Sequence, residues 1–238
     1  MNFDQSGRNL TQQLVHTLGM DIVQGKYTQQ QGLPSEAELC EQYNISRSAT
    51  REAVKMLTAK GLISSRPRQG IRIEPRDQWN LFDAEVLQWI LQGTPTLEML
   101  RDFLQLRIAV EPEAAALAAE HQAPEKIALI EQALERMKAA ESGLDDALEA
   151  DIAFHLSILV ASGNPFYLQL RSFINTALRV SIRYTNRIAG VETASYKTHK
   201  KVYDAIVKGN AQAARRASRD LQAEALELIK DELQAETA

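Results

Sequence analysis

The stretch that decides the fold covers residues 33–73 and reads LPSEAELCEQYNISRSATREAVKMLTAKGLISSRPRQGIRI. It contains a helix start, a short turn, a second helix with arginines near its beginning, and a basic turn between two extended runs. This order is typical of a winged helix-turn-helix. The residues before it are expected to form a supporting helix, and those after it a separate helical domain.

Helix signals divide this stretch into parts. Ser35 is followed three residues later by Glu38, which is the pattern of a capping box and predicts a helix start. Asn44 fits a turn, and Ser46 fits the N-cap of a second helix over about residues 46–60. The sequence therefore predicts two short helices joined by a tight turn.

Arginines and serines gather where a recognition helix would meet DNA. Arg47 and Arg51 are one turn apart, so they project to the same side, where a guanidinium can pair with guanine. Two short strands, over residues 62–65 and 70–73, enclose a basic turn that can reach a minor groove. A merely solvated helix face is the alternative, but the capped turn and the basic wing together favour DNA binding. The predicted DNA-contacting residues are Ser35, Ser46, Arg47, Ser48, Arg51, Arg66, Arg68 and Gly70.

The net charge of -4 hides a difference between the two ends of the chain. Residues 1–76 carry 10 basic and 7 acidic residues, a net charge of +3, whereas residues 77–238 carry 17 and 24, a net charge of -7. A positive front part on an acidic body indicates a polyanionic partner for the front part alone. Because the excess is small, the placement of the arginines must supply the specificity.

The rest of the chain has mostly helical patterns. Apolar residues recur at helical spacing over residues 9–24 and, with almost no strand signals, from residue 96 onward. Pro112 is expected to kink or break one of these helices, and a single helix is expected over about residues 166–188. The sequence predicts a mainly α fold in three parts: a winged helix-turn-helix domain over residues 1–76, a linker with a short helix over residues 77–95, and an all-α antiparallel helical bundle over residues 96–238.

Composition excludes several classes of protein. No run of about 18 uncharged apolar residues occurs, so no membrane span is expected. The first ten residues lack the apolar core of a secretory signal. Cys40 is the single cysteine and cannot form an internal disulfide. These features favour a cytoplasmic protein.

A second group of polar residues suggests a metal site in the bundle. Asp151 and His155 are four residues apart, so they lie on one face of a helix, and His199 is a third candidate ligand. Two histidines and one aspartate suit zinc, nickel or manganese, with positions left for water or an anion. The alternative is a surface hydrogen bond between Asp151 and His155, which spacing alone favours.

The residues of the front part resemble a known family. They look like the N-terminal domain of GntR-superfamily transcription regulators, over roughly residues 10–75. The resemblance implies that Arg47 and Arg51 contact bases or phosphates and that Gly70 contacts the minor groove. The matching positions are Leu33-Pro34-Ser35-Glu36, Leu39, Ser46-Arg47, Arg51-Glu52-Ala53, Leu57, Gly61-Leu62-Ile63 and Gly70.

The bundle resembles the C-terminal FCD domain of the FadR-type branch of the same superfamily. This resemblance implies that Asp151, His155 and His199 bind a divalent metal ion, with zinc favoured over nickel or manganese, and that Arg107 holds an effector carboxylate. The matching positions are Leu106-Arg107, Glu111, Ala118-Ala119-Glu120, Asp151, Phe154-His155, Ser162-Gly163-Asn164-Pro165, His199, Asp204-Ala205-Ile206, Gly209-Asn210 and Ala213-Ala214.

One position departs from that pattern. Many members have a further histidine in the last helix, near Leu221, and this chain has none there. Asp220 is a substitute by chemistry, but its register is off by one residue, which turns it about 100° away on a helix. The site is therefore expected to have three protein ligands plus water or effector, or to bind metal weakly.

Residues 77–89 also resemble sugar-acid regulators of this branch, particularly the galactonate-operon repressor type. The resemblance favours a hexonate or a related sugar acid as the effector. Asn175, Arg179 and Arg183 are candidates to bind its hydroxyl groups, with ordinary packing or surface placement as the alternative for each.

These observations predict a DNA-binding transcription regulator, a repressor by preference, that responds to a small carboxylate. A homodimer on a palindromic operator is expected, because one recognition helix covers too few bases for specificity. The alternative is a metal-dependent enzyme that uses the bundle site, but no general acid, nucleophile or lid accompanies the three ligands. A nucleoid protein without sequence preference would need a larger basic excess.

Overall fold

The computed structural model describes residues 9–66, 70–93 and 95–237. Within them the chain forms two compact units, which meet in sequence between residues 93 and 95. We call these the first unit and the second unit.

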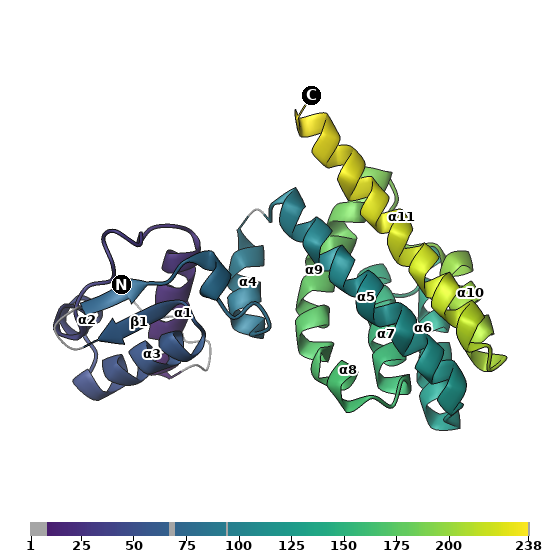
Figure 1. The fold of residues 1–238 in the computed structure, drawn as a ribbon, viewed down its shortest axis with the longest axis horizontal. Coiled ribbons are helices and arrows are strands. Elements are labelled where there is room, and N and C mark those ends of the chain that lie inside the picture. The colour runs from purple at the N-terminus through teal and green to yellow at the C-terminus, as the bar shows by residue number, and fades with distance from the viewer. Residues whose placement is uncertain (1–8, 67–69, 94, 238) are drawn as a thin grey trace. The chain divides into compact units, whose positions relative to one another are not determined.

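The first unit begins with three helices and a hairpin (Figure 1). The helices are α1 (Leu10–Val23), α2 (Glu36–Tyr43) and α3 (Arg47–Ala59), and the strands are β1 (Ile63–Arg66) and β2 (Gly70–Ile73). The strands pair antiparallel with Ile63 opposite Ile73, and Leu33 adds a bridge to Ile71. The helix-turn-helix and the two-stranded wing are therefore both confirmed.

The predicted caps are formed as the sequence indicated. The Ser35 hydroxyl accepts a hydrogen bond from the Glu38 backbone, and the Glu38 carboxylate accepts one from the Ser35 backbone, which completes a capping box. Asn44 ends α2 in the left-handed conformation with φ of 51°, which asparagine tolerates better than most residues. The Ser46 hydroxyl accepts from the Ala49 backbone at the start of α3. These local signals fix where the two helices begin and how they are joined.

The segment expected as a linker is packed on the first unit. It forms a short 3-10 helix, η1 (Arg76–Gln78), and α4 (Ala84–Gln92). Trp89 is 1% exposed, and a Cβ at Gly19 of α1 would overlap its ring, so α1 and α4 approach closely only because position 19 is glycine. Trp89 Nε1 donates to His16 Nδ1 at 2.8 Å. The short helix was therefore predicted correctly, but its apolar face belongs to the core of the first unit.

Ion pairs from the largely buried Lys60 to two carboxylates also hold α4. Lys60 Nζ lies 2.7 Å from Asp83 Oδ2 and 2.8 Å from Glu85 Oε2, and 5.7 Å from the centre of the Trp89 ring. Asp83 is also the N-cap of α4, since its carboxylate accepts from the Glu85 and Val86 backbones. The end of α3 and the start of α4 are thus joined by charge as well as by packing.

The second unit is built from helices alone within the described residues. They are α5 (Leu97–His121), α6 (Pro124–Glu141), α7 (Ala147–Ala161), α8 (Pro165–Gln169), α9 (Arg171–Ala189), α10 (Tyr196–Val207) and α11 (Ala211–Thr237). Pro112 lies inside α5 and does not end it. The single helix expected over residues 166–188 is wrong at its start, because the chain forms two helices that meet at Leu170.

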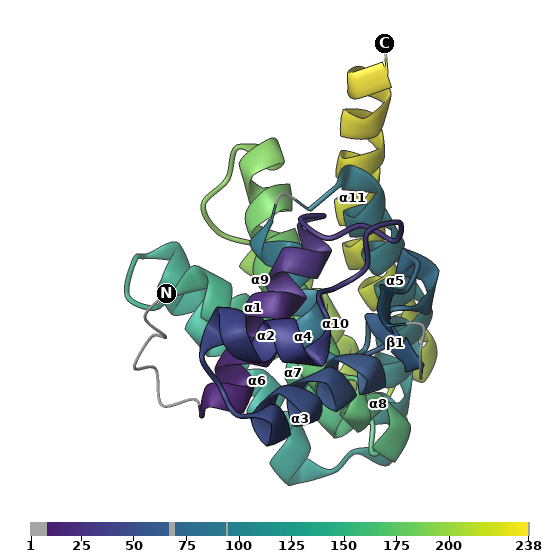
Figure 2. The ribbon, with the colours of Figure 1, turned by 90° about the vertical axis from the view of Figure 1, so that its left-hand side faces the viewer.

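The long helices α5 and α11 form the spine of this unit. They run side by side in opposite directions (Figure 1), and the last turns of α11 extend beyond the other helices of the unit (Figures 1 and 2). α6 and α7 pack together, and α7 also contacts α5 and α9. The antiparallel all-α bundle is confirmed. Among the described helices, none has the length and apolar character needed to cross a membrane.

Candidate metal centre and nucleic-acid interface

The exposed face of α3 carries the polar residues expected to meet DNA. Its opposite face is buried through Thr50, Ala53, Val54 and Leu57. The side chain of Arg51 is 68% exposed, and its Nε lies 3.5 Å from Glu36 Oε2 on α2. The Ser46 and Ser48 hydroxyls lie 3.0 Å apart. Arg47, Ser48 and Arg51 are thus presented together on one exposed surface.

The wing and the α2 cap contribute the remaining positions. Arg66 ends β1 and is exposed, and Gly70 begins β2 with φ of +75°, a conformation that favours glycine. Arg68 lies outside the described residues. The Ser35 hydroxyl is engaged with Glu38 at 2.8 Å, so it serves first as a helix cap.

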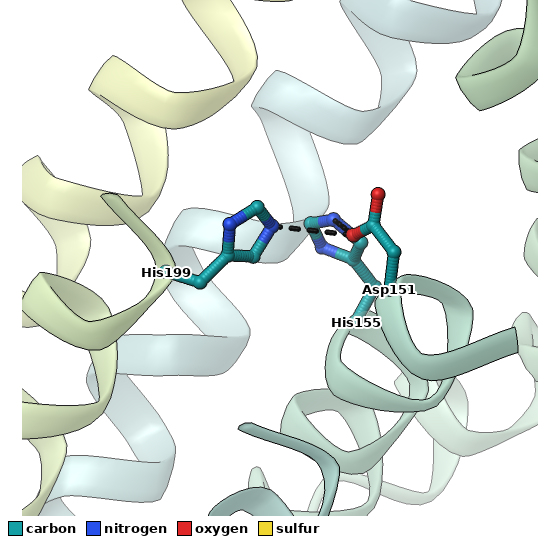
Figure 3. Close-up of side chains that lie close together, drawn as sticks. All are labelled: Asp151, His155 and His199. Atoms are coloured by element: carbon teal, nitrogen blue, oxygen red, sulfur yellow. Dashed lines mark ion pairs between the residues drawn. The ribbon is translucent and has the colours of Figure 1, made fainter. Parts of the chain in front are cut away.

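The three candidate ligands in the second unit come together at one point (Figure 3). Asp151 and His155 lie on α7 and His199 lies on α10, with exposed fractions of 3%, 4% and 3%. Asp151 Oδ1 is 3.2 Å from His155 Nε2 and 3.2 Å from His199 Nε2. The surface hydrogen bond that spacing alone favoured is therefore wrong, because this cluster is buried and contains a third residue from another helix.

The hydrogen bonding of the two imidazoles indicates which kind of group this cluster can bind. His199 Nδ1 lies 2.8 Å from the Ser195 carbonyl oxygen, and His155 Nδ1 lies 2.8 Å from Glu111 Oε2. An imidazole that donates from Nδ1 presents a lone pair at Nε2. Both Nε2 atoms and a carboxylate oxygen, all acceptors, then face one another. Among the described residues, Asp151 Oδ1 and His199 Nε2 are buried without a hydrogen-bond partner, and so is His155 Nδ1 apart from its close approach to the Glu111 carboxylate. A cation satisfies this arrangement, so the residues fit a metal ion.

Glu111 is a buried carboxylate that contacts His155, Arg107 and Gln222. Arg107 Nε donates to Glu111 Oε1 at 2.6 Å, and Gln222 Nε2 donates to Glu111 Oε2. Burial raises the pKa of Glu111, but the charge of Arg107, together with the contact to the His155 imidazole, outweighs it and lowers the pKa to about 2. Burial likewise raises the pKa of Asp151, and the neighbouring His155 and His199 more than reverse this, so its pKa is lowered. Both carboxylates are therefore charged near neutral pH.

A cavity of about 220 Å³ opens next to the cluster. Its floor includes Asp151, His155, His199 and Arg107, all buried. Hydroxyl and amide side chains line its wall, together with apolar side chains from α9 and α11. The polar wall residues are Thr185, Asn186, Thr193, Ser195 and Thr198.

The other predicted effector residues do not line this cavity. Asn175 and Arg179 lie on the same side of α9 as the lining residue Ile182, but one or two turns before it, and Arg179 is paired with Glu149 of α7. Arg183 is exposed and lies one residue, about 100°, from Ile182. Of the four candidates, Arg107 alone lines the cavity.

Glu111 and Gln222 have roles at the cluster that were not predicted from the sequence. The Arg107–Glu111 pair has ion-pair spacing on one helix, a signal that was available. Gln222 is 1% exposed and lies 111 residues from Glu111, so no local pattern could link them. Gln222 lines the cavity next to Leu221, whereas Asp220 is exposed and outside the lining. Asp220 is therefore not a fourth ligand in this arrangement.

Comparison with known proteins finds one family match in each of the two units. Residues 10–73 match the family described as bacterial regulatory proteins, gntR family, and residues 102–223 match the FCD domain. The chain belongs to the gntR family. The regulator is 36% identical over 94% of its length to the galactonate operon transcriptional repressor of Escherichia coli K12, covering 98% of that protein. It is 35% identical over 90% of its length to the HTH-type transcriptional regulator YieP of the same organism, covering 93% of it.

The fold comparison agrees. The solved structure of Lar, which controls expression of the Listeria monocytogenes agr system, aligns with 94% of the regulator and 98% of that chain, with a TM-score of 0.64 and 17% identity. At that identity the likeness shows the shared fold alone. The sequence relatives are transcription regulators, so the interpretation of the chain as a DNA-binding regulator is confirmed over the enzyme alternative.

Proposed function

We propose that this regulator is a repressor whose operator binding is controlled by a small carboxylate, a sugar acid such as a hexonate, bound at a divalent metal in the second unit. The observation that carries the proposal is the buried convergence of Asp151, His155 and His199 at the floor of a cavity. The relative that regulates a galactonate operon supports a hexonate as the effector class. Zinc is the favoured ion, with nickel or manganese as alternatives.

The charges at the cavity floor explain why the acid would require the metal. With neutral imidazoles, Arg107, Glu111 and Asp151 together carry a net charge of minus one, because Glu111 already neutralises Arg107. A bound divalent ion changes the net charge to plus one, which attracts a carboxylate. Arg107 lines the cavity and can orient that carboxylate.

In the first unit, Arg47 and Arg51 would read bases from α3, Ser46 and Ser48 would contact phosphates, and the wing would enter the minor groove. We propose a homodimer on a palindromic operator in the cytoplasm. The acid must bind one arrangement of the two DNA-binding units better than the other, since otherwise it shifts no equilibrium.

The direct test of the sensor is a thermal-shift screen of the metal-loaded protein against sugar acids and short hydroxy acids. Elemental analysis of protein prepared without chelator should find about one metal ion per chain. We expect a hexonate to raise the unfolding temperature of the loaded protein. A broad panel in which no acid shifts it would remove the sensor proposal.

Glu111→Gln should weaken metal binding about 10- to 100-fold while all three ligands remain, because the variant loses the anion that orients His155. The matched control is Glu113→Gln on the same helix, whose partner Arg215 lies at the surface. A chelator competition measures both. Equal metal affinity in the Glu111→Gln and Glu113→Gln variants would show that Glu111 does not support the site.

The same substitution has a pH signature. The folded pKa of Glu111, about 2, lies below the ordinary 4.5, so its charge stabilises the folded state above pH 4.5, and this stabilisation is lost as the pH falls toward 2. The excess stability of the wild type over Glu111→Gln should therefore shrink across that window, as followed by urea unfolding. A difference that does not change with pH would contradict the ion pair.

Arg51→Ala should weaken operator binding by about 5- to 150-fold and leave non-specific DNA binding much less affected, since a base pair contact is worth about 1–3 kcal/mol. Lys55→Ala is a matched control, because it removes the same charge one turn later on α3 from a side chain that is also 68% exposed. That variant should lose both kinds of binding to a similar small extent. Fluorescence anisotropy with operator and random duplexes measures the ratio, and an equal loss for Arg51→Ala would rule out base reading.

A further inference from the structure

The cavity in the second unit has two ends that differ in burial and in charge. Its floor holds the buried Arg107, Asp151 and His199. Its mouth includes Glu224, which lies on α11, is exposed and still lines the cavity. Within the lining, Arg107 is the sole Lys or Arg side chain, and it lies on the floor. The mouth therefore presents a negative charge that no basic lining residue offsets.

Glu224 is also without a partner in the described part of the chain. Neighbouring acidic residues on α11 include Glu227, which pairs with Lys230 at 2.7 Å, whereas no ion pair or hydrogen bond joins Glu224 to another described residue. An ionised carboxylate offers acceptor positions only. It can take hydrogen bonds from ligand hydroxyl groups, and it repels a second anion.

The wall between floor and mouth suits a hydroxylated carbon chain. Thr185, Asn186 and Thr193 offer hydroxyl and amide groups, and Ile182, Leu221 and Ala225 offer apolar surface. The cavity volume of about 220 Å³ is below the roughly 300–1,000 Å³ of drug-sized sites. A small acid fills it, so an acid anchored at the floor would place its far end near the mouth.

We propose that Glu224 is a specificity residue that selects polyhydroxy monocarboxylates and rejects dicarboxylates of the same carbon skeleton. This inference rests on the proposed function, because it takes the floor as the anchor for the single carboxylate. The far hydroxyl group of an aldonate donates to Glu224. In the corresponding aldarate a second carboxylate stands in place of the terminal CH2OH group, and it meets a like charge. Such a repulsive element discriminates between two ligands that the rest of the cavity accepts equally.

The test compares one six-carbon aldonate with the aldarate of the same stereochemistry, titrated calorimetrically into the zinc-loaded full-length protein. We expect the wild type to prefer the aldonate at least about tenfold, as a like-charge contact near a protein surface predicts. Glu224→Gln should reduce that preference by about tenfold, chiefly by gaining the aldarate. Asp220→Asn is the matched control, since it removes an exposed charge one turn earlier on α11 and outside the lining. It should keep the wild-type preference.

The results that would contradict the role of Glu224 differ from those that would contradict the sensor proposal. Equal binding of both acids by the wild type, or an unchanged preference in Glu224→Gln, would overturn the role of Glu224 and leave the sensor proposal standing. Binding of neither acid by any of the three proteins would overturn the sensor proposal and this inference together. A loss of preference in Asp220→Asn as large as in Glu224→Gln would also overturn the inference, because it would assign the effect to overall charge.

Discussion

His199→Ala should lower metal affinity by more than the roughly 10- to 100-fold expected for the loss of an outer-sphere partner. It should also leave the regulator bound to its operator at every acid concentration. The substitution removes one of three buried ligands and leaves Asp151 Oδ1 facing a single imidazole, that of His155. Without the ion the floor keeps its net negative charge and repels the carboxylate. Chelator competition measures the first effect, and operator binding with and without a hexonate measures the second.

His121→Ala is the control for this experiment. His121 is an exposed histidine at the end of α5 in the same unit, and it does not belong to the ligand cluster. The variant should bind metal and respond to acid as the wild type does. If His199→Ala retains wild-type metal affinity, the three-residue centre is wrong.

Trp89→Ala should destabilise the first unit by about 3–5 kcal/mol, which is the usual cost of removing a large buried aromatic side chain. The lost side chain fills the space above Gly19 and donates to His16. Both tryptophans of the chain, Trp79 and Trp89, are buried in the core of the first unit, so the fluorescence of Trp79 reports the unfolding of that unit in the variant.

Leu81→Ala serves as the comparison, because Leu81 is 42% exposed in the same segment and its truncation should cost little. Metal affinity should be unchanged in both variants, since the ligands lie in the second unit. A Trp89→Ala protein as stable as the wild type would show that α4 is not part of the core of the first unit.

Local signals in the sequence were enough for the elements of the first unit. Ser35 with Glu38, and Ser46, mark helix starts through contacts only three residues long, so their pattern is visible in the chain itself. The amphipathic α4 was visible for the same reason. The surface against which α4 packs could not be predicted, because an apolar face shows that a helix needs a partner and does not show which one.

The candidate metal centre was predictable in its ligands but not in its surroundings. Asp151 and His155 share a helix face by spacing, His199 was the third candidate ligand, and the family resemblance favoured metal binding by the three. Arg179 shows what the sequence could not predict. It lies on the same side of α9 as the lining residue Ile182 but outside the cavity, where it pairs with Glu149, which is 30 residues away in sequence. Such long-range pairs depend on how helices pack, which no short window of sequence contains.

Operator binding in four states shows whether an acid releases the operator through the metal centre. Fluorescence anisotropy of a labelled operator would be followed with zinc-loaded and with chelated protein, each with and without a hexonate. We expect the acid to weaken operator binding of the zinc-loaded protein alone. An equal effect of the acid on the chelated protein, or no effect of any hexonate on the loaded one, would contradict it.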